Sequence, residues 1–202
     1  WQLTLESGSL LQARGIVLAV GNTPKPLPAR GASSLPAQSV LEAWDFDSLK
    51  RIPTDAEVCI AGSGLSMVDT VLSLLANGHR GRMHVLSRHA LLPLPHTAHS
   101  VATLETGFLQ RLSLRARMRF LRRAVEKAEA GGLPWQAVME AVRPSVQALW
   151  STLCLRDQKR FLRHVVRYWD VHRHRIAAQV HAQLQQLQAS GQLQLHRARL
   201  DT

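Results

Sequence analysis

A glycine-rich turn is the part of this 202-residue sequence whose residue types and spacing point to the most specific chemistry. Residues 62–67 are GSGLSM. This is close to the G-x-G-x-x-G pattern, in which one glycine makes a tight turn and the next lets the backbone approach a pyrophosphate at a helix N-terminus. Met67 stands where the third glycine is usual, which predicts looser helix–strand packing or a different local route. The candidate ligands of a dinucleotide pyrophosphate are Gly62, Ser63, Gly64 and Leu65.

A second pair of candidate ligands follows the glycines at the distance where dinucleotide sites select between cofactors. About 20 residues beyond the glycines, an Asp or Glu accepts hydrogen bonds from the ribose 2′-hydroxyl of NAD, whereas a 2′-phosphate calls for arginine. Ser87 and Arg88 occupy this place, and a hydroxyl and a guanidinium both donate to phosphate oxygens. The pair favours NADP(H) over NAD(H). The alternative is an ordinary exposed arginine at the end of a strand.

The elements around these residues predict a Rossmann-like α/β core. Residues 57–62 (EVCIAG) form an apolar strand, residues 66–78 have helical periodicity, and residues 82–88 (RMHVLSR) form a second strand. Together they make a βαβ unit of about 30 residues, which is the length such a unit needs. The glycine turn then lies between the first strand and the helix, in the context that a dinucleotide site requires.

A largely helical insertion, over about 105–190, interrupts this core. Ser113 is placed to cap a helix that stops at Gly131, and a second helix opens at Pro134 and is kinked or broken at Pro144. A third helical segment runs from about Arg156 to Ala189, before a short strand at 192–198. We therefore assign residues 53–202 to a nucleotide-binding domain that contains the insertion.

The first 52 residues differ from the rest in composition and in periodicity. Residues 2–6, 10–14 and 15–21 predict a short β-meander whose last strand, GIVLAVG, is fully buried. Residues 22–56 are rich in Pro, Ala and Ser and have no convincing period, which predicts a linker or surface crossing with a boundary near Pro53.

These pieces resemble a known family. The stretch VCIAGSGLSMVDTVLSLLANGHRGRMHVLSRHALLP (58–93), with GIVLAVGNTP (15–24) before it and YWDVHRHRIA (168–177) after it, is similar to a poorly characterised bacterial family of FAD/NAD(P)-binding oxidoreductases. Their wider kin are flavoproteins with two dinucleotide-binding domains, among them the flavin-dependent N-hydroxylating monooxygenases. The matching pieces cover about a quarter of the chain.

The resemblance implies an enzyme in which the NAD(P) domain is inserted into an FAD domain and hydride passes between nicotinamide and flavin. Residues 1–52 would be the C-terminal part of the FAD domain, with Gly21 near the flavin. Because these residues hold no glycine motif for the FAD pyrophosphate, we expect the chain to be an internal fragment and FAD to bind the full-length protein. The resemblance also implies that Asp170, His172 and Arg175 pack against the FAD domain or line the substrate cleft.

Charge provides the main rival interpretation. The chain has 25 Lys and Arg against 14 Asp and Glu, and residues 105–202 hold 17 of these cations against 7 acids. Arginines 111, 115, 119, 122 and 123 share one helical side opposite apolar residues, which predicts a solvated face or one that attracts an acidic partner or nucleic acid. The lack of an aromatic stacking platform on that side argues against nucleic acid. The alternative function is therefore a non-catalytic Rossmann-like module that binds such a partner.

Other classes of function are disfavoured. Cys59 and Cys154 are 95 positions apart, which provides neither a disulfide framework nor a cysteine zinc site and favours a cytoplasmic, reducing compartment. His172 and His174 point apart on a helix, so no metal site is expected. No apolar stretch predicts a membrane span, and no hydrolase motif is present. The sequence identifies no catalytic acid or base, no electron acceptor and no oligomeric state.

Overall fold

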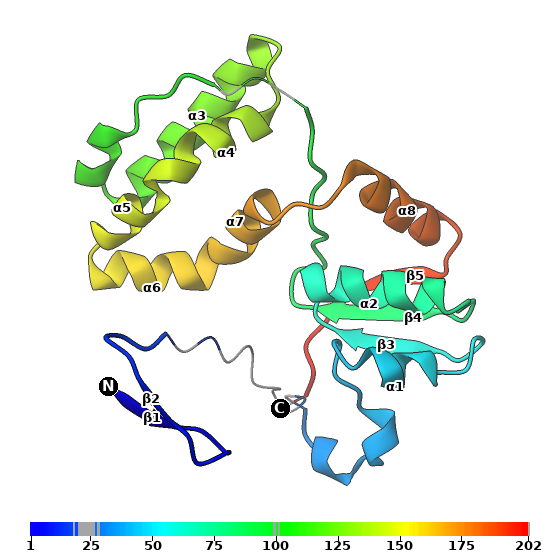
Figure 1. The fold of residues 1–202 in the computed structure, drawn as a ribbon. Helices are drawn as coiled ribbons and strands as arrows, with labels where there is room; N and C mark the ends of the chain where they lie inside the picture. Colours follow the sequence, from blue (N-terminus) through cyan, green and yellow to red (C-terminus); the bar gives the residue numbers. More distant parts are fainter. Residues whose placement is uncertain (18, 20–26, 28, 99, 101, 202) are drawn as a thin grey trace.

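The computed structural model describes residues 1–17, 19, 27, 29–98, 100 and 102–201. In these residues, a hairpin comes first along the chain, and a parallel sheet with its helices follows, with a helical region inserted between two of its strands (Figure 1). The strands are β1 (Gln2–Thr4), β2 (Leu10–Gln12), β3 (Val58–Ala61), β4 (Met83–Ser87) and β5 (Leu193–Arg197). The α-helices are α1 (Phe46–Lys50), α2 (Leu65–Ala76), α3 (Leu114–Ala130), α4 (Trp135–Val142), α5 (Val146–Ser151), α6 (Leu155–His164), α7 (Val166–Arg173) and α8 (Ala178–Ala189).

The parallel sheet confirms the predicted βαβ unit. Its described strands have the order β3-β4-β5, with Val58 opposite Met83 and Met83 opposite Leu193. Alternate residues of these strands face the helices, because successive side chains of a strand point to opposite faces. Met83, Val85 and Leu193 on that face are fully buried. The coarse class, mixed α/β with a parallel sheet, is as predicted.

Helices α2 and α8 supply the other half of the core. Val71 and Leu74 from α2 and Leu184 from α8 are buried in the same cluster as the strand residues. The predicted third helical segment, 156–189, is in fact three helices, and its last helix, α8, belongs with the sheet as the crossover before β5. The sequence pattern did not separate them because no glycine or proline lies between residues 156 and 189 to mark the breaks.

A backbone clip joins the two ends of the helical region. The chain that leaves β4 passes Leu94 and His96, and the chain that returns from α7 passes Ile176. The Ile176 N–H donates to Leu94 O at 3.0 Å, and the His96 N–H donates to Ile176 O at 2.8 Å. Ile176 is itself buried in the sheet core. The clip therefore fixes the start and the end of the insertion beside the sheet (Figure 1).

Within the insertion, the first helix confirms its sequence signals. The Ser113 hydroxyl accepts a hydrogen bond from the Ala116 N–H at the start of α3, and Gly131 ends the helix. A short 3-10 turn, Arg143–Ser145, separates α4 from α5 at the predicted break. The predicted solvated side of α3 is exposed at Arg115, Arg119, Arg122 and Arg123, and Arg111, which is also exposed, lies in the 3-10 turn before the helix.

Arg117 is an exception on the same helix, because it is buried. Its guanidinium donates to the carbonyls of Leu112 and Gln110 at 2.8 and 2.9 Å, and also to the Leu149 carbonyl. Burial lowers the pKa of Arg117, while the charge of Asp157 opposes this effect. Arg117 thus satisfies backbone carbonyls between α3 and α5 instead of joining the exposed arginines.

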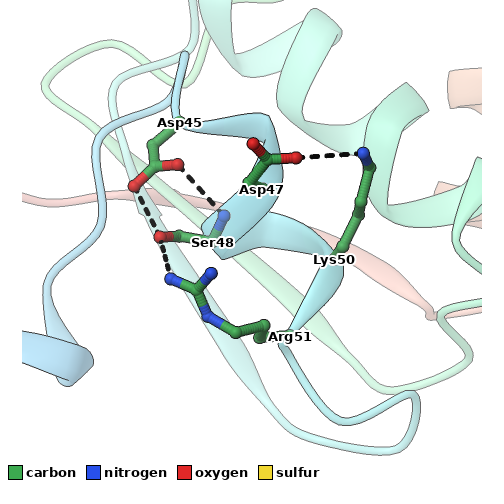
Figure 2. Close-up of polar contacts among 5 residues, drawn as sticks. All are labelled: Asp45, Asp47, Ser48, Lys50 and Arg51. Atoms are coloured by element: carbon green, nitrogen blue, oxygen red, sulfur yellow. Dashed lines mark hydrogen bonds and ion pairs between the residues drawn. The ribbon is translucent and has the colours of Figure 1, made fainter.

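Helix α1 corrects the prediction that residues 22–56 lack regular structure. Two 3-10 turns, Ala32–Ser34 and Ala37–Ser39, precede it. Asp45 caps α1 by accepting from the backbone N–H and the hydroxyl of Ser48, and these bonds lower the pKa of the Asp45 carboxyl (Figure 2). Arg51 donates to the Ser48 hydroxyl in turn. Leu49 is buried, and α1 packs against α2.

The N-terminal segment is a hairpin, not the predicted meander. Strands β1 and β2 pair antiparallel, with Leu3 opposite Leu11. The described residues of the predicted third strand form no strand, and Ile16 and Val17 are 40% and 91% exposed, so the prediction of a buried strand is wrong there. No described element covers this segment, which removes the reason for burial. Gly21, the expected neighbour of a flavin, lies outside the described residues.

None of the helices in the described ranges is long and apolar enough to span a bilayer.

We predict that Gly81→Ala destabilises the sheet strongly. A Cβ on Gly81 would lie 2.0 Å from the Ala56 carbonyl oxygen and 2.8 Å from the Asp55 carbonyl carbon, so backbone would have to move. The expected loss is about 3 kcal/mol, measured as a lower midpoint in urea unfolding. Gly107→Ala is the control, because no described atom lies within 4 Å of its added Cβ. Equal midpoints for the two variants would contradict this packing.

Candidate functional site

A cleft of about 890 Å³ opens at the carboxyl edge of the parallel sheet. Its lining brings together residues from the ends of all three strands and from α7, and among them are all six described residues predicted as cofactor ligands. Those six are Gly62, Ser63, Gly64, Leu65, Ser87 and Arg88. The others are Ala61, Leu86, His89, Leu91, Pro93, Arg167, Asp170, Val171, His174, Ala198, Arg199 and Leu200.

The glycine turn presents bare backbone to this cleft. Gly62 has a φ of +109°, which glycine adopts readily and other residues do not, and its N–H donates to Leu86 O at 2.8 Å. Gly64 is the N-cap of α2, and no side chain caps the helix there. No described atom lies within 4 Å of a Cβ built on either glycine. The first N–H groups of α2 therefore carry no side-chain cap, which leaves them available to an anion.

Met67 explains how the helix starts without the third glycine. Its side chain is 3% exposed and belongs to the core cluster between α2 and the sheet. The Met67 thioether therefore contributes to the core between the helix and the strands. A flexible methionine side chain can fill an irregular space in such a core. The turn toward the cleft is kept.

A pair of serine hydroxyls ties the glycine turn to the end of β4. The Ser63 hydroxyl donates to the Ser87 hydroxyl at 2.9 Å, and the Ala90 N–H donates to the same Ser87 oxygen at 2.9 Å. A hydroxyl has two acceptor lone pairs and one proton. With both acceptor places filled, the remaining hydrogen of Ser87 is free to donate to a ligand in the cleft.

The loop after β4 is held in a tight turn. Ala90 has a φ of +49°, in the left-handed region that costs a non-glycine residue about 1 kcal/mol or more. The bond from Ala90 N–H to Ser87 closes this turn over Arg88 and His89, which both line the cleft. Backbone strain of this kind gathers at ligand sites.

The cleft carries an excess of positive charge. Its described lining holds three arginines, Arg88, Arg167 and Arg199, against one carboxylate, Asp170. Arg167 lies 3.8 Å from Asp170 in an ion pair. Arg88 and Arg199 form no ion pair within the described ranges. The net field therefore favours an anionic ligand with more than one negative group.

Helix α7 forms one wall of the cleft. Arg167, Asp170 and His174 have the 3–4 spacing of a single helical side, and they line the cleft together. The resemblance implied that Asp170 lines a substrate cleft or packs against an FAD domain, and in the structure Asp170 lines this cleft. His172 and Arg175 do not line the cleft but face α4 instead.

The side of α7 that faces α4 is aromatic and half-buried. The His172 ring meets the Trp135 ring edge-on with centroids 4.7 Å apart, and the Arg175 guanidinium lies 5.8 Å from the same indole. Arg175 also forms an ion pair and hydrogen bond with Glu140, and its side chain is 4% exposed. The Arg175–Glu140 pair thus holds the end of α7 against α4, while the other side of α7 lines the cleft.

The charge of Glu140 depends on two arginines. Burial, the largest individual effect, raises the pKa of the Glu140 carboxyl, but the hydrogen bond from Arg143 and the charges of Arg175 and Arg143 together lower it below its ordinary value. The carboxylate is therefore ionised across the neutral range. It supports the site by positioning α7.

Arg167, His174 and Arg199 are among the cleft residues that sequence reasoning missed. Arg199 follows β5 as Arg88 follows β4, so the rule that ligands gather beyond the carboxyl ends of parallel strands could have found it. Arg167 and His174 share a helical side with Asp170, but nothing in the sequence shows which side of α7 meets the sheet.

Comparisons with known proteins assign no family to this chain, so the interpretation of the cleft depends on its geometry. Searches of family models, curated proteins and solved structures found no match for the chain. Across the described residues, no three His, Cys, Asp or Glu side chains gather as metal ligands would, and Cys59 and Cys154 are both free.

We predict that Glu140→Gln lowers stability by about 2 kcal/mol at neutral pH, because it leaves the buried Arg175 guanidinium without its counter-charge. Since the pKa of Glu140 is lowered by folding, its stabilisation is present above the unfolded pKa and is lost as the pH falls. The difference between variant and wild type should shrink below about pH 4 in thermal unfolding.

Asp47→Asn is the matched control, because it breaks the exposed Asp47–Lys50 ion pair (Figure 2). No resolvable change is expected for this variant. A loss as large as that of Glu140→Gln, or a difference for Glu140→Gln that persists unchanged into acid, would rule out the role given to Glu140.

Proposed function

We propose that this chain holds the NADP(H)-binding domain of an FAD-dependent oxidoreductase. The observation that carries the proposal is the convergence of the glycine turn, the open N-terminus of α2, Ser87 and Arg88 in one positively charged cleft. Each of these elements can bind one phosphate group of a phosphorylated dinucleotide, either the pyrophosphate or the 2′-phosphate. The resemblance of residues 58–93 to FAD/NAD(P)-binding oxidoreductases supports the same assignment and supplies the flavin.

The cleft residues divide the dinucleotide between them. The backbone of Gly62, Ser63, Gly64 and Leu65 would receive the pyrophosphate, because N–H groups at a helix start attract negative charge. Ser87 and Arg88 would receive the 2′-phosphate through a hydroxyl hydrogen and a guanidinium, which is the stronger donor because it is charged. This division favours NADP(H) over NAD(H).

The protein's contribution to the reaction is positional. When bound, the two cofactors supply hydride transfer from the nicotinamide to the flavin. The glycine turn and the α7 wall fix the nicotinamide end of the cleft, and a fixed geometry lowers the entropic cost of bringing the two rings together. Gly21 is proposed to lie beside the flavin. No described residue is assigned as a catalytic acid or base.

We predict that the chain binds NADP⁺ more tightly than NAD⁺ and that Arg88→Ala removes the preference. The variant should weaken NADP⁺ binding about tenfold or more, since a hydrogen bond to a charged group contributes about 1.5–3 kcal/mol. NAD⁺ binding should change little. Isothermal titration calorimetry measures both affinities. Equal affinity of the wild type for the two nucleotides would overturn the assignment of Arg88.

For the flavin, we predict that the full-length protein is yellow and that NADPH bleaches its flavin absorbance under anaerobic conditions. Gly64→Ala should slow this reduction strongly, because its Cβ would enter the space given to the pyrophosphate. Its extended backbone (φ −89°) accepts alanine without strain, so the fold should survive. Gly107→Ala is the control. Protein that stays colourless after FAD is added would exclude a flavoenzyme.

A second candidate is the binding module without chemistry. It is favoured by α6, where the exposed Arg156, Lys159 and Arg163 share one helical side along a hollow of about 460 Å³. Such a row attracts acidic partners in general. This candidate takes first place if the chain binds neither nicotinamide nucleotide.

A further inference from the structure

Besides Arg88, the cleft holds a second arginine, Arg199, whose charge no ion pair in the described ranges neutralises. Arg199 follows β5 and lines the same cleft as Arg88. Both guanidinium groups lack an ion-pair partner in the described ranges, whereas Arg167, the third arginine of the cleft, is paired with Asp170. Two like charges in one cleft repel each other unless an anion lies between them. The unpaired arginines are therefore the ones that favour a ligand phosphate.

The backbone brings Arg199 next to Arg88. Ser87 is the register partner of Arg197 on the neighbouring parallel strand, and the Ala198 N–H donates to Ser87 O at 3.0 Å. Neighbouring strands lie about 4.8 Å apart. The chain leaving β5 thus runs alongside the turn that carries Arg88 and His89, so that the two arginines approach the cleft from adjacent strand ends.

The same segment is held on its far side. The Arg30 N–H donates to Asp201 O at 2.6 Å, and the side chains of these two residues form an ion pair at 4.0 Å. Residues 198–201 are therefore anchored at both ends, by Ser87 and by Arg30. A side chain on an anchored segment loses less freedom when it binds a ligand, which increases the affinity it can contribute.

We propose that Arg199 is a second phosphate-binding residue, which closes on the 2′-phosphate of NADP(H) opposite Arg88. The inference rests on the proposed function and adds a specificity residue to it. Ser87 donates its hydroxyl hydrogen between the two guanidinium groups. A phosphomonoester has enough acceptor oxygens for all three donors, and a ribose hydroxyl does not.

The test compares Arg199→Ala with Arg197→Ala by calorimetric titration of NADP⁺, NAD⁺, adenosine 2′,5′-bisphosphate and 5′-AMP. Arg197 is the matched control, because it is an exposed arginine two residues away that does not line the cleft. Arg199→Ala should weaken both 2′-phosphorylated ligands about tenfold and leave NAD⁺ and 5′-AMP within about twofold. Arg197→Ala should leave all four within about twofold.

The outcomes separate this inference from the proposed function. If Arg88→Ala weakens NADP⁺ and Arg199→Ala does not, the role of Arg199 is wrong and the proposed function stands. If Arg199→Ala weakens NADP⁺ and NAD⁺ equally, its contact is not with the 2′-phosphate and the inference fails. If the wild type binds none of the four ligands, the proposed function fails first. Thermal unfolding of Arg199→Ala should match the wild type, because the side chain is exposed.

Discussion

The clip between residues 94–96 and Ile176 is the constraint on which the cleft depends. The helical insertion leaves the core after β4 and returns just before α8, and the hydrogen bonds of the clip hold these two crossings together. Because only two residues lie between the end of α7 at Arg173 and Ile176, the clip also sets where α7 lies. The wall that carries Asp170 and His174 faces the glycine turn for this reason, although about 100 residues of chain separate them. A long insertion can thus complete a site without disturbing the sheet.

The sequence predicted those parts of the fold that depend on neighbouring residues. The βαβ unit, the cap at Ser113 and the break near Pro144 are all local, since caps, turns and prolines act within one or two helical turns. The predictions that failed depend on contacts between elements that are far apart in the sequence. The run GIVLAVG has the composition of a buried strand, but its described residues Ile16 and Val17 are exposed, because burial needs a partner that no described element provides. Likewise, α8 differs from α6 and α7 through what it packs against and not through its pattern.

The candidate site shows the same division. The glycine turn and Ser87–Arg88 could be predicted, because glycines or phosphate-binding side chains directly after a strand are the known pattern of a dinucleotide site. The hydrogen bond between Ser63 and Ser87 could not, since it joins two loops through the folded sheet. This hydrogen bond nevertheless occupies an acceptor place on the Ser87 oxygen and so leaves the hydroxyl hydrogen for a ligand. The role of Arg175 was missed for a similar reason, because Glu140 meets it only when α4 and α7 pack.

The pairing of β4 with β5 has a consequence for the order of folding. Met83 and Leu193 are register partners, yet about 110 residues separate them. Closing so long a loop in an unfolded chain is entropically costly and slow. Within the insertion, α3 contacts α4, and α7 contacts both α4 and α6. Contacts of this kind that form before β5 pairs with β4 would shorten the loop that this pairing has to close.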